Sequence, residues 1–213
     1  MTVEQLIAGH AQATPLKTAL IQGQTEVSYG MLWKEIVRSA SWFRDHAEQG
    51  DRVVVSASKD IGFVYIYFGA HLAGMVCVPV DPETNERRLQ RILEVAQPRL
   101  IVGELRHHEG HGVIPFSDVF PDKAYRFDFP IDSNVADLLF TTGTTGLPKG
   151  VALTFANQMA AVDNINTFIG NTVEDVEMLA LPISHSFGLG RLRCVLAKGA
   201  TLVLLRSEEH TSE

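Results

Sequence analysis

Apolar and polar residues follow one another along this chain with spacings that are typical of helices and strands. Apolar side chains recur at helical spacing over residues 3–13 and again after Ser28, a residue type that favours the position just before a helix. Two short strands around a Gly-containing turn are predicted within residues 19–27. The second helix is expected to end near Gly50, since glycine is common just past a helix.

From residue 52 onward, the pattern predicts strands and helices in alternation. We expect strands at 52–56, 76–80, 100–102, 135–140, 178–181 and 200–205, and helices at 61–72, 85–95, 157–168 and 190–197. The exception is the segment 104–134, which is expected to be irregular because it is rich in His, Gly, Asp and Pro. Such alternation predicts an α/β fold, with mixed or parallel sheets flanked by helices.

One segment is apolar enough to be considered as a membrane-spanning helix. Residues 61–80 carry no formal charge, and a run of about 20 residues is the length that a bilayer requires. However, Gly69, Gly74 and Pro79 interrupt the run, and the residues after Gly74 are typical of a short strand. We therefore favour a buried helix followed by a strand, and expect no integral membrane segment.

Composition and charge narrow the class of protein. With 213 residues, 46% hydrophobic and 20% charged, the chain has the balance of a globular protein. Its net charge of -7 is spread without a basic block, which argues against nucleic acid as a partner. Cys77 and Cys194 lie far apart in apolar stretches, as buried thiols of a reducing compartment would, and the start lacks the pattern of a secretion signal. These features predict a cytoplasmic protein.

Residues 140–151 have a composition suited to holding phosphates. They read Phe-Thr-Thr-Gly-Thr-Thr-Gly-Leu-Pro-Lys-Gly-Val. Glycines let backbone N–H groups converge on an anion, threonine hydroxyls add donors, and lysine adds a positive charge. The spacing is not that of a Walker A loop, because Lys149 lies between Pro148 and Gly150. An ordinary linker is the disfavoured alternative. The candidate nucleotide-binding residues are Thr141, Thr142, Gly143, Thr144, Thr145, Gly146 and Lys149.

This segment closely resembles the signature loop of the adenylate-forming superfamily, which comprises acyl-CoA synthetases, peptide-synthetase adenylation domains and luciferases. Thr142 stands where the family usually has serine, and Phe155 replaces the histidine of the Leu-Thr-His-x-Asn continuation. Further resemblances lie in order at 50–53, 72–82, 181–189 and 199–205, the third reading Leu-Pro-Ile-Ser-His-Ser-Phe-Gly-Leu. The resemblance implies that residues 1–205 are part of a large N-terminal AMP-binding (adenylation) domain.

The resemblance also implies an activity. A substrate carboxylate would attack the α-phosphorus of ATP, giving an acyl-adenylate and pyrophosphate, and a thiol of coenzyme A or of a phosphopantetheine on an acyl carrier protein would then take the acyl group. Mg²⁺ is implied as a cofactor, with its ligands unassigned. Lys149 would stabilise the charge that grows on pyrophosphate. Fatty or aryl acids are preferred as substrates, because no aspartate for an amino-acid ammonium can be assigned.

His185 and Ser186 are candidates for the acid-binding side of the site. Spacing alone favours a structural role for a lone histidine such as His185. The resemblance instead implies that His185 lines the acyl and adenylate site beside Ser186, and that Lys149 and His185 belong to the catalytic centre. Proton transfer by His185 is not implied.

Three other features are given structural interpretations. The histidines of residues 107–111 lack the spacing of a His-Glu-x-x-His metal site and are interpreted as a solvated loop. The charges of residues 86–88 are interpreted as the solvated face of a helix start rather than a nucleotide contact. Asp81 and Pro82 are expected to end a strand and open a turn.

The end of the sequence bears on activity. Family motifs for adenine, ribose and the distal lysine do not occur, so we interpret the chain as a truncated piece that is inactive alone. Residues 206–213, Arg-Ser-Glu-Glu-His-Thr-Ser-Glu, match no family element, and their codons could spell a common sequencing adapter, so they are interpreted as a non-family tail of artefactual origin. The alternative function is a non-catalytic nucleotide-binding module.

Overall fold

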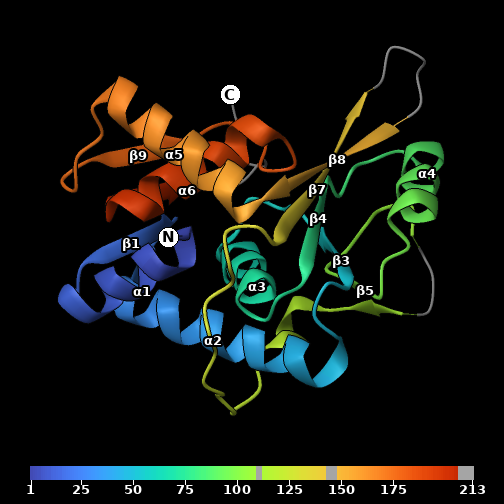
Figure 1. The fold of residues 1–213 in the computed structure, drawn as a ribbon, viewed down its shortest axis with the longest axis horizontal. Helices are drawn as coiled ribbons and strands as arrows, with labels where there is room; N and C mark the ends of the chain where they lie inside the picture. The colour runs from blue at the N-terminus through green and yellow to red at the C-terminus, as the bar shows by residue number, and fades with distance from the viewer. Residues whose placement is uncertain (109–111, 143–147, 206–213) are drawn as a thin grey trace.

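The computed structural model describes residues 1–108, 112–142 and 148–205, and these form two sheets flanked by helices (Figure 1). The α/β class with mixed sheets is therefore confirmed. The helices are α1 (Val3–Ala13), α2 (Tyr29–His46), α3 (Ile61–Leu72), α4 (Glu86–Ala96), η1 (Phe116–Val119), α5 (Phe155–Ile169) and α6 (Ser186–Lys198). The strands are β1 (Thr18–Gln22), β2 (Thr25–Ser28), β3 (Arg52–Ser56), β4 (Val76–Val80), β5 (Leu100–Val102), β6 (Val113–Ile114), β7 (Val135–Thr142), β8 (Pro148–Thr154), β9 (Val176–Leu179) and β10 (Thr201–Leu204).

Within the described ranges, one sheet has the strand order β6-β5-β3-β4-β7-β8 and the other β2-β1-β10-β9. Neighbouring strands of the first sheet are parallel except for the antiparallel pair β7–β8. In the second sheet, β1 is antiparallel to β2 and parallel to β10. The carboxyl ends of β3, β4, β5 and β7 therefore meet at one edge of the first sheet, where ligands of α/β proteins commonly bind.

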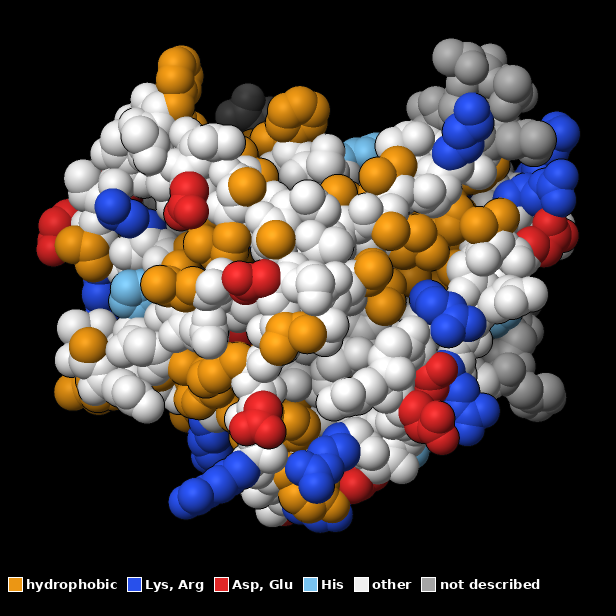
Figure 2. All heavy atoms as spheres, viewed as in Figure 1, with side chains coloured by type: hydrophobic (Ala, Val, Ile, Leu, Met, Phe, Trp, Pro, Cys, Tyr) orange, Lys and Arg blue, Asp and Glu red, His pale blue; other side chains and the backbone are white. Residues whose placement is uncertain are grey.

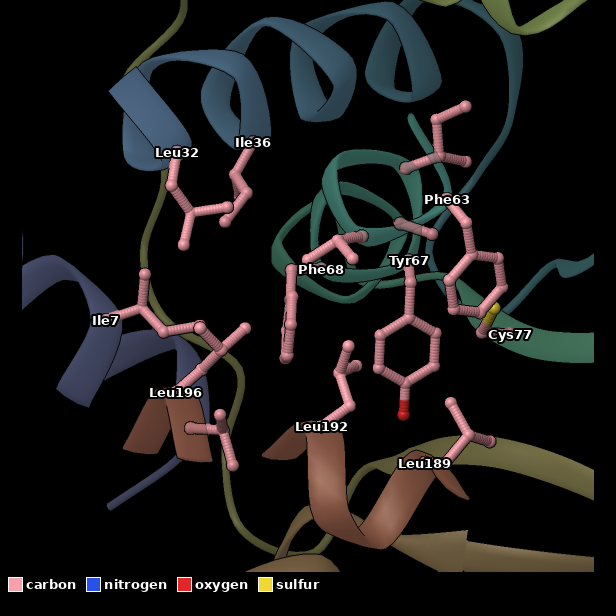
Figure 3. Packing of buried hydrophobic residues seen from close by; sticks show 14 of the residues in the cluster. Ile7, Leu32, Ile36, Phe63, Tyr67, Phe68, Cys77, Leu189, Leu192 and Leu196 are labelled. Atoms are coloured by element: carbon pink, nitrogen blue, oxygen red, sulfur yellow. The ribbon is translucent and has the colours of Figure 1, made fainter. Parts of the chain in front are cut away.

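The main hydrophobic core joins the helices to both sheets. Its largest fully buried side chains include Tyr67, Phe63 and Phe68 of α3, which lies in the middle of the molecule (Figure 1). Helix α6 lies on the side of α3 that faces away from α2, and its Leu192 and Leu196 point toward these aromatic residues, as Figure 3 shows. Because α3 and α6 belong to one core, the cores of the two sheets are not independent.

The apolar run 61–80 is a buried helix and a strand, as predicted. α3 ends at Leu72, Gly74 adopts a φ of +84° that favours glycine, and β4 follows with every residue buried. None of the helices in the described part of the chain is long and apolar enough to cross a membrane.

The expected element bounds are right for residues 3–13, 52–56, 61–72, 76–80 and 100–102 and wrong in several other places. α5 begins at Phe155 rather than at residue 157, because Thr154 and Asn157 form a reciprocal capping box that places the helix start two residues earlier. α2 ends at His46, before Gly50. The segment 104–134 contains the short elements β6 and η1, and Arg38 of α2 holds its Phe120 and Pro121 carbonyl groups by hydrogen bonds.

Candidate active site

The segment 140–151 is largely a β-hairpin in the described residues, and its interpretation as one continuous loop is wrong there. β7 runs to Thr142, and β8 begins at Pro148, with Thr141 directly opposite Lys149 in an antiparallel register. β8 is mostly exposed and lacks an alternating apolar pattern, so pairing with β7 stabilises it rather than burial. Gly143, Thr144, Thr145 and Gly146 lie outside the described residues.

Directly opposite side chains lie on the same face of an antiparallel pair, so the exposed side chains of Thr141 and Lys149 are neighbours. Together they offer a hydroxyl and an ammonium donor at the end of the hairpin. Lys and Arg side chains gather in the same corner of the molecule, over α4 and the hairpin (Figure 2). This corner therefore favours an anionic ligand.

A cavity of about 390 Å³ lies beside the hairpin. Its apolar wall is formed by Leu139, Phe140, Val151 and Leu153 of the two strands. Its polar lining comprises Arg88, Thr141, Ser184, His185 and Ser186. A second cavity of about 390 Å³ adjoins it and shares Arg88, Phe140, Ser184 and His185. The structure thus brings Thr141, His185 and Ser186 together around one space; Lys149 does not line it but is paired with Thr141.

His185 and Ser186 reach the cavity because α6 begins there. His185 is the N-cap residue, its side chain makes no capping hydrogen bond, and both side chains are exposed. A helix N-terminus presents unpaired N–H groups and partial positive charge, which suits a carboxylate or phosphate. The helix starts at Ser186, not at residue 190 as expected, and in its first turn the Gly188 backbone packs closely against Pro182. A Cβ on Gly188 would lie 2.1 Å from the Pro182 carbonyl oxygen.

Arg88 lines the candidate site, although the sequence interpretation did not favour a ligand contact there. A solvated helix face is the right interpretation for Glu86 and Arg87, which are exposed, but it is wrong for Arg88. The half-buried Arg88 guanidinium donates to the carbonyl oxygen of Phe140 at 3.1 Å and lines both cavities. Its place three residues after the helix N-cap Asn85 could have indicated a face turned toward the sheet.

Asp81 holds the segment before α6 in place. Its Oδ2 accepts a hydrogen bond from the Ser184 hydroxyl at 3.1 Å, and its Oδ1 accepts one from the Glu83 backbone N–H at 2.9 Å. The expected turn after β4 is confirmed by the latter bond. The carboxyl end of β4 is thereby joined to the residues that precede His185.

No group of three or more His, Cys, Asp or Glu side chains is placed to hold a metal ion within residues 1–108, 112–142 and 148–205. The histidine-containing segment 107–111 falls partly outside these residues, so its interpretation as a solvated loop stays a prediction. The interpretation of residues 206–213 as a non-family tail also lies outside the described residues.

The fold is that of the N-terminal domain of adenylate-forming enzymes, to which two solved structures are similar. The chain superposes on VinN, solved in complex with 3-methylaspartate, with a TM-score of 0.85 and 25% identity, over 96% of this chain and 62% of that one. It also superposes on the Klebsiella oxytoca NpsA N-terminal subdomain with a TM-score of 0.85 and 20% identity, over 96% of this chain and 53% of that one. The second likeness is one of fold alone.

The model of the family described as AMP-binding enzyme matches residues 7–213, and this chain belongs to that family. It is 32% identical to the nonribosomal peptide synthetase acrB of Aspergillus aculeatus over 74% of this chain and 10% of the synthetase. It is 28% identical to the 2-succinylbenzoate–CoA ligase of Bacillus velezensis over 91% of this chain and 42% of the ligase. The chain therefore spans less than half of either relative.

Proposed function

We propose that this chain carries the phosphate-binding and acid-binding side of an ATP-dependent acid–thiol ligase. In the proposed reaction, a carboxylate oxygen attacks the α-phosphorus of ATP, and the bond to the bridging oxygen breaks as pyrophosphate leaves. A thiol of coenzyme A or of a phosphopantetheine carrier then displaces AMP from the acyl-adenylate. The observation that carries the proposal is the cavity that Thr141, His185 and Ser186 share beside the in-register pair Thr141–Lys149.

The roles follow from chemistry at these positions. Negative charge grows on the leaving pyrophosphate, and the Lys149 ammonium with the threonine hydroxyls of residues 141–145 would stabilise it where it develops. Arg88 adds a half-buried cation within the same lining. Mg²⁺ would be held chiefly by the phosphates, as this ion commonly is, and would neutralise their charge.

The acid is proposed to occupy the apolar part of the cavity. Leu139, Phe140, Val151 and Leu153 offer a hydrocarbon surface, which favours a fatty or aryl acid and a role in fatty acid metabolism. His185 and Ser186 at the start of α6 would lie near the carboxylate end, where the helix N-terminus favours negative charge. We further propose a cytoplasmic enzyme whose partner is coenzyme A or an acyl carrier protein.

Calorimetric titration tests the phosphate site directly. ATP and, separately, pyrophosphate are titrated with Mg²⁺ into the chain, and Lys149→Ala is expected to weaken binding about tenfold, the loss of one charge-assisted hydrogen bond. Lys34→Ala, an exposed lysine on α2, serves as the matched control and is expected to bind like the parent chain. Equal affinities for Lys149→Ala and the parent would contradict the assignment.

A second assay separates ligase from binding module. Pyrophosphate release is measured with a panel of fatty and aryl acids, using the protein as purified from its source. Release supports the ligase. Nucleotide binding without release supports the non-catalytic module instead.

A further inference from the structure

A cluster of charged and polar side chains lies in the core behind the cavity. We call it the Asp137 cluster; it comprises Glu4, Tyr67, His71, Asp137, Gln158 and Arg193, all buried. Its members come from α1, α3, β7, α5 and α6. Figure 3 shows the Tyr67 hydroxyl directed from α3 toward α6, which lies next to Tyr67 in the core. None of these residues lines the cavity beside the hairpin.

Asp137 is the centre of this cluster. Its Oδ2 accepts hydrogen bonds from Tyr67 Oη at 2.9 Å, Gln158 Nε2 at 2.8 Å and Arg193 Nη1 at 2.9 Å. Its Oδ1 lies 3.0 Å from His71 Nε2. The other ring nitrogen of His71 lies 2.9 Å from Glu4 Oε1. A buried carboxylate with this many partners is geometrically restricted, because each donor fixes its direction.

Two members of the cluster stand on the elements that form opposite sides of the cavity. Asp137 is four residues before Thr141 on β7, a distance of about 13 Å along a strand. Arg193 is seven residues after Ser186 on α6, about 10 Å along a helix. The cluster therefore joins β7 and α6 at points that lie at similar distances from the cavity. Along β7 the cavity is reached at Thr141, and along α6 it is reached at the start of the helix.

A buried ion pair is a poor source of stability compared with apolar packing, but it can specify one arrangement among several that packing allows. Apolar contacts between α6 and α3 would tolerate a shift of the helix along its axis, because Leu and Phe side chains repack. The Arg193 guanidinium would lose its contacts with both Asp137 and Tyr67 in such a shift.

We propose that Asp137 and Arg193 are positioning residues whose ion pair sets the distance across the cavity between Thr141 and the start of α6. Neither residue touches the ligand; they act through the strand and the helix that carry the ligand-binding groups. The functional meaning of this distance rests on the proposed ligase activity, whereas the distance itself does not.

Electron-paramagnetic distance measurement tests the inference on the chain itself. Spin labels are attached at Val151→Cys and Phe187→Cys, which are 45% and 78% exposed, whereas Cys77 and Cys194 are fully buried and resist labelling in the folded state. In Arg193→Met, Asp137 keeps His71, Tyr67 and Gln158 as partners, so the fold is expected to persist. The distance distribution is expected to broaden or to shift by about 1.5 to 3 Å, the rise of one or two helical residues.

Two further variants distinguish positioning from packing. Arg193→Lys restores a cation near Asp137 and is expected to restore the parent distribution, whereas a packing role predicts that Met and Lys behave alike. Arg191→Met removes the other α6 ion pair, with Glu177, and is expected to leave the distance unchanged. If Arg193→Met is unfolded by circular dichroism, Arg193→Gln takes its place with the same expectation.

The inference is overturned if Arg193→Met matches the parent distribution, or if Arg191→Met alters it as much as Arg193→Met does. ATP affinity, measured on the same variants, is expected to fall about fivefold in Arg193→Met and to recover in Arg193→Lys. If the parent chain binds no ATP, the proposed function fails while the distance measurements still decide the positioning role.

Discussion

Asp137 and Thr141, at the two ends of the segment 137–141 of β7, differ in burial and in hydrogen bonding. Asp137 is fully buried and hydrogen-bonded by side chains from three helices, whereas Thr141, a few residues further on, is exposed in a hairpin. A phosphate needs donors that are free to bind it, and such donors cannot be satisfied beforehand by the protein. The contrast teaches that one strand can combine a rigid, buried end with an exposed end, to which we assign the proposed phosphate contacts.

The largest effect on stability is expected from removing the buried carboxylate of Asp137. Asp137→Ala is expected to lower the free energy of unfolding by about 3 to 5 kcal/mol, because the buried Arg193 would lose its counter-charge and His71 would keep only Glu4. Urea unfolding followed by circular dichroism measures this. Asp132→Ala, which removes an exposed pair with the N-terminus, should leave the midpoint nearly unchanged; similar losses in both variants would contradict the central place of Asp137.

The pH dependence of the free energy of unfolding tests the same buried cluster around Asp137, through the protonation of His71. Burial alone would lower the pKa of His71, but the hydrogen bonds and charges of Asp137 and Glu4 outweigh it and raise this pKa to about 9. Tyr67, hydrogen-bonded to Asp137, has a pKa well above 10, because burial disfavours its ionised form, so it remains neutral in this range.

Because the folded-state pKa of His71 exceeds the ordinary value of 6.5, its contribution to stability is fully present below pH 6.5 and is lost as the pH rises through 9. A loss of about 3 kcal/mol between these pH values is expected in urea unfolding. His71→Gln should remove most of this slope, whereas His46→Gln, at an exposed position, should retain it. A parent chain equally stable at pH 6.5 and 9.5 would contradict the protonated state of His71.

A smaller effect is expected where α6 begins. Gly188→Ala would place a Cβ 2.1 Å from the Pro182 carbonyl oxygen and is expected to cost about 1 to 3 kcal/mol as the helix start moves away. Gly190→Ala is the matched control on the same helix, since nothing lies within 4 Å of its Cβ, and alanine should there be neutral or slightly stabilising. Thermal unfolding compares the two, and a harmless Gly188→Ala would show that the contact is not tight.

The exposed end of β7 should show the smallest effect on stability and a clear effect on binding. Thr141→Val keeps a β-branched shape suited to a strand but removes the hydroxyl. The free energy of unfolding should therefore be almost unchanged, while the free energy of ATP binding becomes less favourable by about 1 kcal/mol. Thr25→Val, on the exposed part of β2, provides the control for calorimetry. A large loss of stability in Thr141→Val would contradict the expected difference between Thr141 and the buried Asp137.

The sequence could predict those elements whose residues are buried on one or both faces. α3 and β4 are predicted to the residue, because an apolar run broken by Gly74 allows few alternatives. β8 was not predicted, because it is stabilised by backbone pairing with β7 and carries little apolar pattern. The start of α6 was also misplaced, since Gly188 disfavours a helix locally and the pattern of residues gives no sign of its close packing against Pro182.

For the candidate site, the sequence indicated Thr141, His185 and Ser186, which the fold brings to one cavity. Arg88 was undervalued, since a charged residue near a helix start is usually solvated and its contact with the Phe140 carbonyl depends on tertiary structure. The Asp137 cluster was not foreseen for a related reason. Glu4, His71 and Arg193 lie on separate helices, and only the packing of those helices brings the three together.

The parallel pairing of β1 with β10 has a consequence for how this chain acquires its structure. Leu20 pairs with Leu202, so β1 acquires this neighbour only after all the residues between the two strands have been made. Until then, the hairpin β1–β2 exposes an apolar edge on which non-native pairing is possible. Contacts so distant in sequence slow the folding of a domain. We expect this sheet to form late, and the nascent chain to depend on chaperones during that interval.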